Sequence, residues 1–132
     1  MQVRQPIKIN SFEEAGGHVA WVFGAGAGWP VARRRRVAEV IVRHMWDAVD
    51  VAQDPEGHLL ELSTGMDISG RRTEDIPEDL RADVLAQYPR LGLDGEFVAC
   101  FEDQAARKPD GLAAKLVGRG FAARVAANPL DR

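Results

Sequence analysis

Glycine and proline divide this chain into short segments, and that division most strongly limits the folds open to it. The 132 residues include 13 glycines and seven prolines. Between them, apolar residues recur every three or four positions, as they do on one face of an α-helix. A period of two, typical of strands, is seen only weakly at Val3, Ile7 and Ile9. The pattern predicts an all-α array of helices joined by short loops.

Start and stop signals predict where the helices lie. Ser11, with an acid three positions later, forms a capping-box pattern and predicts a first helix over 11–24. Pro30 suits the first turn of a second helix, which should be the longest. Asp54 followed by Pro55 is typical of the start of a third helix. Later helices are expected within 76–89, 94–109, 110–120 and 121–131.

The spacing of apolar residues also predicts which side of each helix faces inward. The predicted inward positions are Phe12, Ala15, Val19, Val22 and Phe23; Val37, Val40, Ile41, His44 and Met45; Leu59, Leu60 and Leu62; Leu80, Val84, Leu85 and Tyr88; and Phe97, Cys100, Phe101 and Gln104. We expect residues 1–10 to be loosely held and residues 11–132 to form a single helical domain.

Composition narrows the class of protein. A net charge of −3 gives no overall attraction to phosphate, which argues against binding to nucleic acid or a membrane surface. No apolar run approaches the ~20 residues that span a bilayer. The single cysteine, Cys100, excludes an intrachain disulfide and is expected to be a small core residue. A cytoplasmic location is the corresponding expectation.

Two motifs have a simple structural interpretation beside a functional one. The glycines of GAGAGW suggest a phosphate loop, but that loop follows a strand, whereas a helix is predicted here, so a helix-to-helix turn is favoured. The run Arg33–Arg36 could contact an acidic partner or nucleic acid. Consecutive helical residues point in directions about 100° apart, so a solvated helix start is favoured.

The candidate site residues are a few acids and histidines. His18, His44 and His58 could meet at a metal, although a helical histidine is more often a hydrogen-bonded residue of a partly buried face. Glu13 lies in a first turn, where an acid is favoured by the helix dipole. Asp67 follows apolar residues near the end of the third helix. Its carboxylate is therefore expected in a poorly hydrated pocket, where it needs a cation or several donors.

Two stretches resemble the C-terminal part of HD-domain proteins of the cyanamide hydratase-like group, a branch of the HD metal-dependent phosphohydrolase superfamily. They are FEEAGGHVAWVFGAGAGWPVARRRRVAEVIVRHM and DPEGHLLELSTGMDISGRR. The resemblance implies a helical HD fold, with Asp67 as the fourth ligand of a divalent metal. It also implies that His44 lies near the metal or faces the substrate, and that Glu13 matches an acid of the group's first segment.

The chain departs from that pattern at the other ligands. The family's first histidine and its His-Asp dipeptide precede the FEE segment, where this chain has ten residues, and its own histidines are followed by Val19, Met45 and Leu59. Three of the four ligands are therefore missing. Because the loss of even one supporting partner weakens a metal site 10- to 100-fold, we expect no metal and no hydrolase activity in this chain alone.

The resemblance also implies that helices are missing from the fold. Those helices would cover apolar positions such as Val40, Ile41, Leu59 and Leu62, and uncovered apolar surface favours association. The sequence thus predicts self-association or a partner that supplies the cover. The alternative is a small helical binding or regulatory module that uses the basic surface of Arg33–Arg36.

Overall fold

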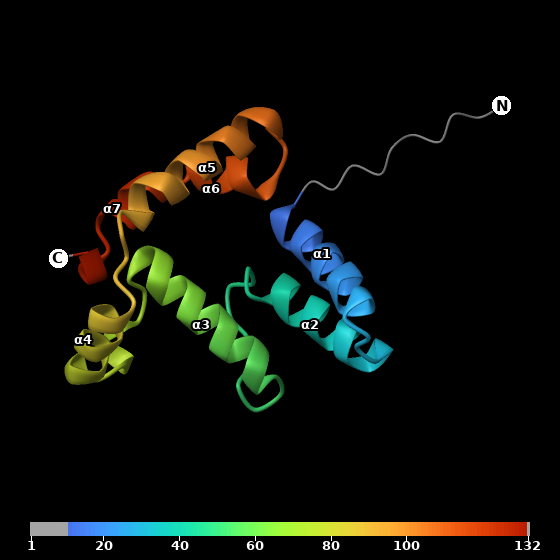
Figure 1. Cartoon of the computed structure of the whole chain (residues 1–132). Helices are drawn as coiled ribbons and strands as arrows, with labels where there is room; N and C mark the ends of the chain where they lie inside the picture. The colour runs from blue at the N-terminus through green and yellow to red at the C-terminus, as the bar shows by residue number, and fades with distance from the viewer. Residues whose placement is uncertain (1–10, 132) are drawn as a thin grey trace.

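The computed structural model describes residues 11–131, and every regular element in that range is helical (Figure 1). The α-helices are α1 (Phe12–Gly26), α2 (Val31–Arg43), α3 (Pro55–Ser69), α4 (Glu78–Gln87), α5 (Leu93–Arg107), α6 (Leu112–Gly118) and α7 (Phe121–Ala126). Two short 3₁₀ turns, η1 (Thr73–Asp75) and η2 (Pro129–Asp131), complete the set. The all-α prediction is confirmed. The expectation for residues 1–10 lies outside the described residues.

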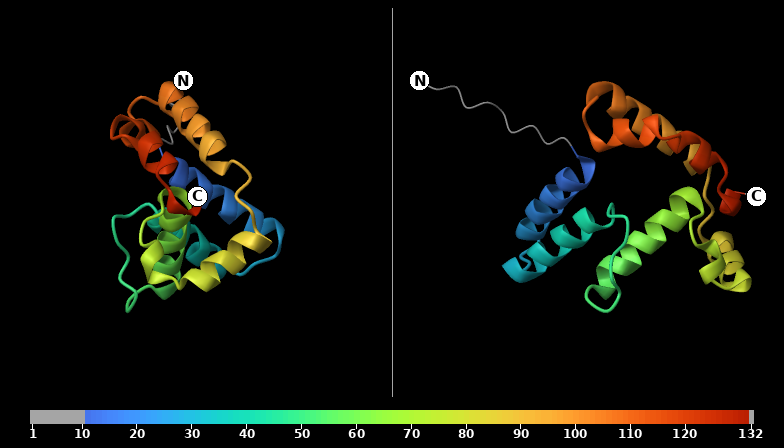
Figure 2. Two further views of the ribbon diagram at one scale, coloured as in Figure 1. Left: turned by 90° about the vertical axis from the view of Figure 1, so that its left-hand side faces the viewer. Right: turned by 180° about the vertical axis from the view of Figure 1, so that it is seen from behind.

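The helices follow an open arc (Figures 1 and 2). Helices α1 and α2 lie side by side as a hairpin at one end, and α5 and α6 lie side by side with α7 close by. Helix α3 lies between these two groups, and α4 projects beyond it. No helix within 11–131 is long and apolar enough to cross a membrane.

The α1–α2 hairpin is packed through glycine rather than through the predicted apolar stripe. A Cβ atom at Gly17 would lie 3.3 Å from the carbonyl oxygen of Ala38, and one at Gly16 would lie 3.2 Å from Ile41. The absence of side chains there lets the two backbones approach closely. The predicted inward positions Val19, Val22 and Phe23 are wrong, because these side chains are exposed, whereas the predicted Phe12 and Ala15 are half-buried.

The turn between these helices is the predicted helix-to-helix turn, with Gly28 in the left-handed region at φ +72°. Three features nearby differ from the sequence predictions. Ser11 makes no side-chain cap hydrogen bond, so the capping box does not form. Pro30 precedes α2 as its N-cap residue. Helix α2 has 13 residues, fewer than the 15 of α1, α3 and α5, so it is not the longest.

The start of α3 is built as the sequence predicts, with Pro55 as the first residue and Asp54 as the cap. The buried carboxylate of Asp54 accepts a 2.9 Å hydrogen bond from the Gly57 N–H. It also accepts from Arg36 and, at 2.6 Å, from Arg43, both of α2. One side chain therefore caps α3 and joins it to α2.

The inward face of α3 differs from the predicted leucine face. Leu59 is exposed, whereas Gly57 and Glu61 are buried and Ile68 is half-buried. These inward residues recur at helical spacing, so the pattern is rotated rather than lost. The rotation follows from contacts that the apolar pattern does not include: the Asp54 junction at one end and the buried Glu61 in the middle.

The core is small and lies among α5, α6 and α7. Phe101, Ala113, Phe121 and Val125 form its buried cluster. The rings of Phe101 and Phe121 stack with centroids 4.3 Å apart. Cys100 is exposed, so its predicted core role is wrong.

Lowering the pH should weaken the α2–α3 junction. Hydrogen bonds from Arg36 and Arg43 hold the pKa of Asp54 well below its ordinary value of 3.8. A carboxyl with a lower pKa in the folded chain stabilises the fold fully above its unfolded pKa, and this contribution is lost as pH falls through the folded value. We expect the free energy of unfolding, measured with urea, to fall below about pH 5. Asp54→Asn should flatten that slope.

The matched control is Asp110→Asn, which changes an exposed carboxylate on a loop. It should leave the pH dependence as in the wild type. A slope in Asp54→Asn as steep as the wild-type slope would contradict the role given to this carboxylate.

Candidate functional site

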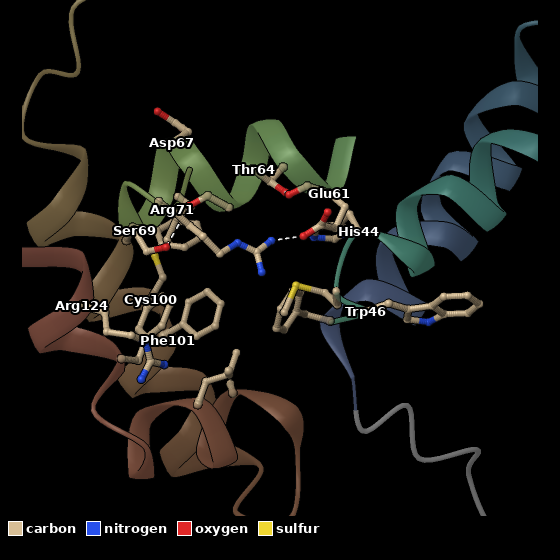
Figure 3. Close-up of a pocket in the computed structure, with 18 of the residues that line it drawn as sticks. His44, Trp46, Glu61, Thr64, Asp67, Ser69, Arg71, Cys100, Phe101 and Arg124 are labelled. Carbon is tan, nitrogen blue, oxygen red and sulfur yellow. Dashed lines mark hydrogen bonds and ion pairs between the residues drawn. The ribbon is translucent and has the colours of Figure 1, made fainter. Parts of the chain in front are cut away.

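A groove of about 740 Å³ lies between α3, the α5–α7 group and the segment that follows α2 (Figure 3). This volume lies in the range of 300–1,000 Å³ that ligand sites occupy. Its lining includes Met45 and Trp46 from the segment after α2, and Phe12 from the start of α1. The groove therefore collects residues from nearly the whole length of the described chain.

One side of the groove is apolar and continuous with the core. Phe97, Phe101, Phe121 and Leu116 line it from the α5–α7 group, and Ile68 lines it from α3. Phe97 lies 5.0 Å from Phe101, centroid to centroid. This side of the core is thus open to the groove rather than covered by another helix.

The α3 side carries the buried carboxylate of Glu61. Its side chain is only 5% exposed and is ion-paired with Arg71, whose own side chain is 46% exposed. Figure 3 shows the guanidinium of Arg71 reaching across the groove wall toward Glu61. A Cβ at Gly65 would lie 2.8 Å from that guanidinium, so the glycine leaves room for the pair. The carboxylate is neutralised locally, as a buried charge requires.

His44 is brought to the groove, as its predicted inward position requires. It lies at the C-cap of α2, and its ring nitrogen Nδ1 hydrogen-bonds to the carbonyl oxygen of Ile41. A carbonyl only accepts, so Nδ1 is the donor of this bond, and Nε2 is an acceptor whenever the ring is uncharged. His44 can therefore accept a hydrogen bond from a molecule in the groove.

Asp67 is placed differently from the prediction. Asp67 is among the residues that line the groove, as His44 is, but its side chain is 56% exposed and its carboxylate points away from the groove in Figure 3. Arg90 bonds to this carboxylate and to that of Asp131. The predicted poorly hydrated pocket is therefore wrong: the carboxylate faces solvent with an arginine as its cation.

The other predicted ligands are scattered. Glu13 is half-buried in the first turn of α1, outside the groove, with Oε2 unpartnered within the described residues. His18 is exposed, and His58 donates from Nδ1 to the Val49 carbonyl at 2.8 Å. Within 11–131 no three histidine, cysteine, aspartate or glutamate side chains gather as a metal-binding group. The described residues therefore do not fit the divalent metal that the resemblance implies.

The arginine run is divided among several contacts. Arg33 stacks on Trp29 at 4.2 Å, and Arg34 stacks on Trp21 at 5.0 Å. Arg36 pairs with Asp54 and Glu56. Arg33 and Arg35 are exposed, as a solvated helix start requires, whereas Arg34 and Arg36 are half-buried.

The buried amide of Asn128 joins the C-terminal segment to α3. Asn128 is fully buried, and its Nδ2 donates to the Asp67 carbonyl at 2.7 Å near the end of α3. Its Oδ1 accepts from the Leu130 N–H at 2.9 Å. Gly70 allows the approach, because a Cβ there would lie 2.2 Å from Pro129. The C-terminal segment is thereby fastened to α3.

Comparison of the chain with protein-family models, with curated proteins and with solved structures found no match. The groove, rather than kinship, is therefore the basis for any functional conclusion.

Sequence reasoning missed Glu61, Arg71, Arg90 and Asn128. Glu61 was missed because the neighbouring leucines, Leu59, Leu60 and Leu62, were predicted to face inward in its place. The sequence did contain one signal: Glu61 lies one helical turn after Gly57 and one turn before Gly65. The two glycines leave that face of α3 with little side-chain bulk, so another segment can approach it closely. Arg90 and Asn128 act over long sequence separations and left no local pattern.

The two members of the Glu61–Arg71 pair should contribute unequally to stability when each is substituted alone. Arg71→Gln leaves a buried carboxylate without its cation and should lower the free energy of unfolding by roughly 2–3 kcal/mol. Glu61→Gln leaves an arginine that can turn to water, and should lower it by about 1 kcal/mol. Urea denaturation of the two variants and the double variant measures the difference. Equal losses would contradict the burial assigned to Glu61.

Asn128→Asp should destabilise the fold more than Asn128→Ala. The alanine removes donors to the end of α3 and should lower the free energy of unfolding by about 1–3 kcal/mol. The aspartate also places a carboxylate against the Asp67 carbonyl. Gln53→Ala, at an exposed position, is the control and should change stability by less than about 0.5 kcal/mol. If the Asn128→Asp protein were as stable as the wild type, the role given to the hydrogen bond between Asn128 and the Asp67 carbonyl would be contradicted.

Proposed function

We propose that this chain is a docking module, built on the C-terminal helices of an HD-type scaffold like that of the cyanamide hydratase-like group. Its groove receives the apolar face of a helix from another polypeptide. The observation that carries the proposal is the 740 Å³ groove, whose apolar side is the exposed edge of the protein's own small core.

A helix suits the groove better than a small substrate does. The polar groups at its edge are largely engaged within the chain, since Glu61 is paired with Arg71 and Nδ1 of His44 with Ile41. An apolar helix face needs few polar partners and gains from covering aromatic rings. Burial of this kind contributes about 25 cal/mol for each Å² of apolar surface removed from water.

A catalytic role at Asp67 is not supported. Asp67 and His44 both line the groove, but the carboxylate of Asp67 turns away from it in Figure 3 and is held by Arg90. An acid and a histidine must both reach one reacting centre to share a metal or a substrate. The relation to hydratases and phosphohydrolases is thus proposed for the scaffold alone.

The reactivity of Cys100 measures whether the groove is covered, because this thiol is exposed and lines the groove. If a helix covers the groove, alkylation of Cys100 should slow several-fold as the protein is concentrated from about 1 to about 100 micromolar, a range in which standard interfaces assemble. A Cys100→Ser, Ser63→Cys variant provides the control, since Ser63 is exposed on α3 outside the groove. Its alkylation rate should stay constant. A Cys100 rate independent of concentration and of added lysate proteins would contradict docking.

A further inference from the structure

We propose that the free end of the α1–α2 hairpin inserts into the surface of a lipid bilayer that contains anionic lipids. The groove lies at the other end of this hairpin, where Phe12 begins α1 and His44 follows α2. The inference therefore adds a second site and does not rest on the docking function.

The hairpin ends in an apolar turn. Residues 19–32 carry no charged side chain, and their only polar side-chain groups are the indole N–H groups of two tryptophans. Connections between helices usually carry polar side chains that face water. Here Val22 and Phe23 at the end of α1 are 69% and 65% exposed, and Val31 at the start of α2 is 50% exposed. In Figures 1 and 2 this turn stands at the free end of the arc.

The apolar end is held in one conformation by its own contacts. The ring of Phe23 meets that of Trp29 edge to face, with centroids 5.8 Å apart. Trp29 lies over the buried Gly24, where a Cβ atom would come within 2.7 Å of the ring. Because these groups are already ordered, their transfer to another surface loses little conformational entropy.

Arginines follow directly behind the apolar end. Arg33 and Arg35 are exposed in the first turns of α2, and the guanidinium of Arg33 stacks on Trp29 at 4.2 Å. No acidic residue occurs from 15 to 38, although the whole chain has a charge of −3. The charge of the whole chain argues against a membrane surface, but salt screens charges beyond about 8–10 Å, so the charge near the point of contact decides. Anionic headgroups that approach this end meet arginines first.

The distance between the apolar residues and the arginines matches the depth of a membrane interface. With about 1.5 Å of rise for each residue, Arg35 lies about 6 Å behind Val31 along α2. Segments bound at an interface bury apolar side chains about 5–10 Å deep and keep their basic side chains at the headgroups. Tryptophan is enriched at the boundary between these two layers, which is where Trp29 lies relative to Arg33.

A bilayer suits this end better than another macromolecule does. Nucleic acid would neutralise the arginines but would leave Val22 and Val31 without apolar contacts. Two copies of this chain that met end to end would bring their arginines together, and like charges disfavour such a contact. A bilayer accepts a projecting apolar end without a preformed pocket and offers phosphate groups to the arginines behind it.

Sedimentation with lipid vesicles tests the proposal on the intact chain. The probes are vesicles of phosphatidylcholine alone and vesicles in which about one third of the lipid is phosphatidylserine. We expect binding to the anionic vesicles to be at least about tenfold tighter and to weaken as salt rises from about 50 to about 500 millimolar. Absence of binding to the anionic vesicles at low salt overturns the proposal. Binding to soluble polyglutamate in its place would identify an acidic protein as the partner and would also overturn it.

The double variant Val22→Gln, Phe23→Gln removes apolar side chains without changing the charge. Both positions are exposed and glutamine favours helices, so the helix content measured by circular dichroism should not change. Binding to anionic vesicles should fall about tenfold or more, because less apolar surface leaves water. Val19→Gln, Val22→Gln serves as a second variant if the first loses helix content, since Val19 is 68% exposed.

Helix α4 provides the matched control. Leu80 and Val84 are 50% and 48% exposed, and Tyr88 after them is 73% exposed, so their predicted inward orientation is wrong. Leu80→Gln, Val84→Gln removes a similar apolar surface from a different place and should leave vesicle binding unchanged. An equal loss of binding in this control and in the hairpin variants would overturn the hairpin end as the site.

Neutralising one arginine tests the contribution of charge. Arg35→Gln should weaken binding to anionic vesicles about fivefold, whereas Arg119→Gln, at an exposed position beyond α6, should not change it. If Arg35→Gln weakens binding while both apolar hairpin variants bind like the wild type, charge alone attaches the chain and insertion is overturned.

Discussion

The position of α3 relative to the C-terminal helices depends on the buried amide of Asn128. Its Nδ2 bonds to the last turn of α3, where the carbonyl groups lack partners within the helix. Gly70 and Pro129 lie in contact at the same point. This contact joins segments about sixty residues apart, and Arg90, bound to both Asp67 and Asp131, joins the same two segments.

A second joint at Asp54 fixes the other end of α3. The carboxylate caps the helix and accepts from two arginines of α2, so one buried acid orients two helices. Between the two joints, α3 carries the buried Glu61 and its arginine partner. Polar contacts therefore determine which face of α3 is turned inward. The positions of its leucines follow from these contacts and do not set the rotation of the helix.

The small core explains why a partner is expected at the groove. Only five apolar residues of the described chain are buried, while side chains as large as Phe23, Tyr88 and Leu91 are exposed. Exposed apolar area of this extent favours association, because its removal from water is the main favourable contribution to protein–protein binding.

The residues that the resemblance associates with metal chemistry are each held by a different contact. Arg90 draws Asp67 toward the C-terminal segment, and the carbonyl of Ile41 fixes one side of the His44 ring. Glu13 stays at the start of α1, away from both. His44 and Asp67 therefore both line the groove with their polar groups held by separate contacts, and Glu13 lies outside it.

Local signals in the sequence determined the elements: the helical period, the proline and glycine boundaries and the Asp54 cap predicted the α-helices and most of their ends. They also placed His44, Phe97 and Phe101 on faces that line the groove. Only the tertiary structure decided the rotation of α1 and α3, the burial of Glu61, the exposure of α4 and Cys100, and the turning of Asp67 to Arg90. These depend on contacts between residues far apart in the chain, namely backbones approaching at glycines and buried polar groups finding partners, and neither leaves a periodic pattern in the sequence.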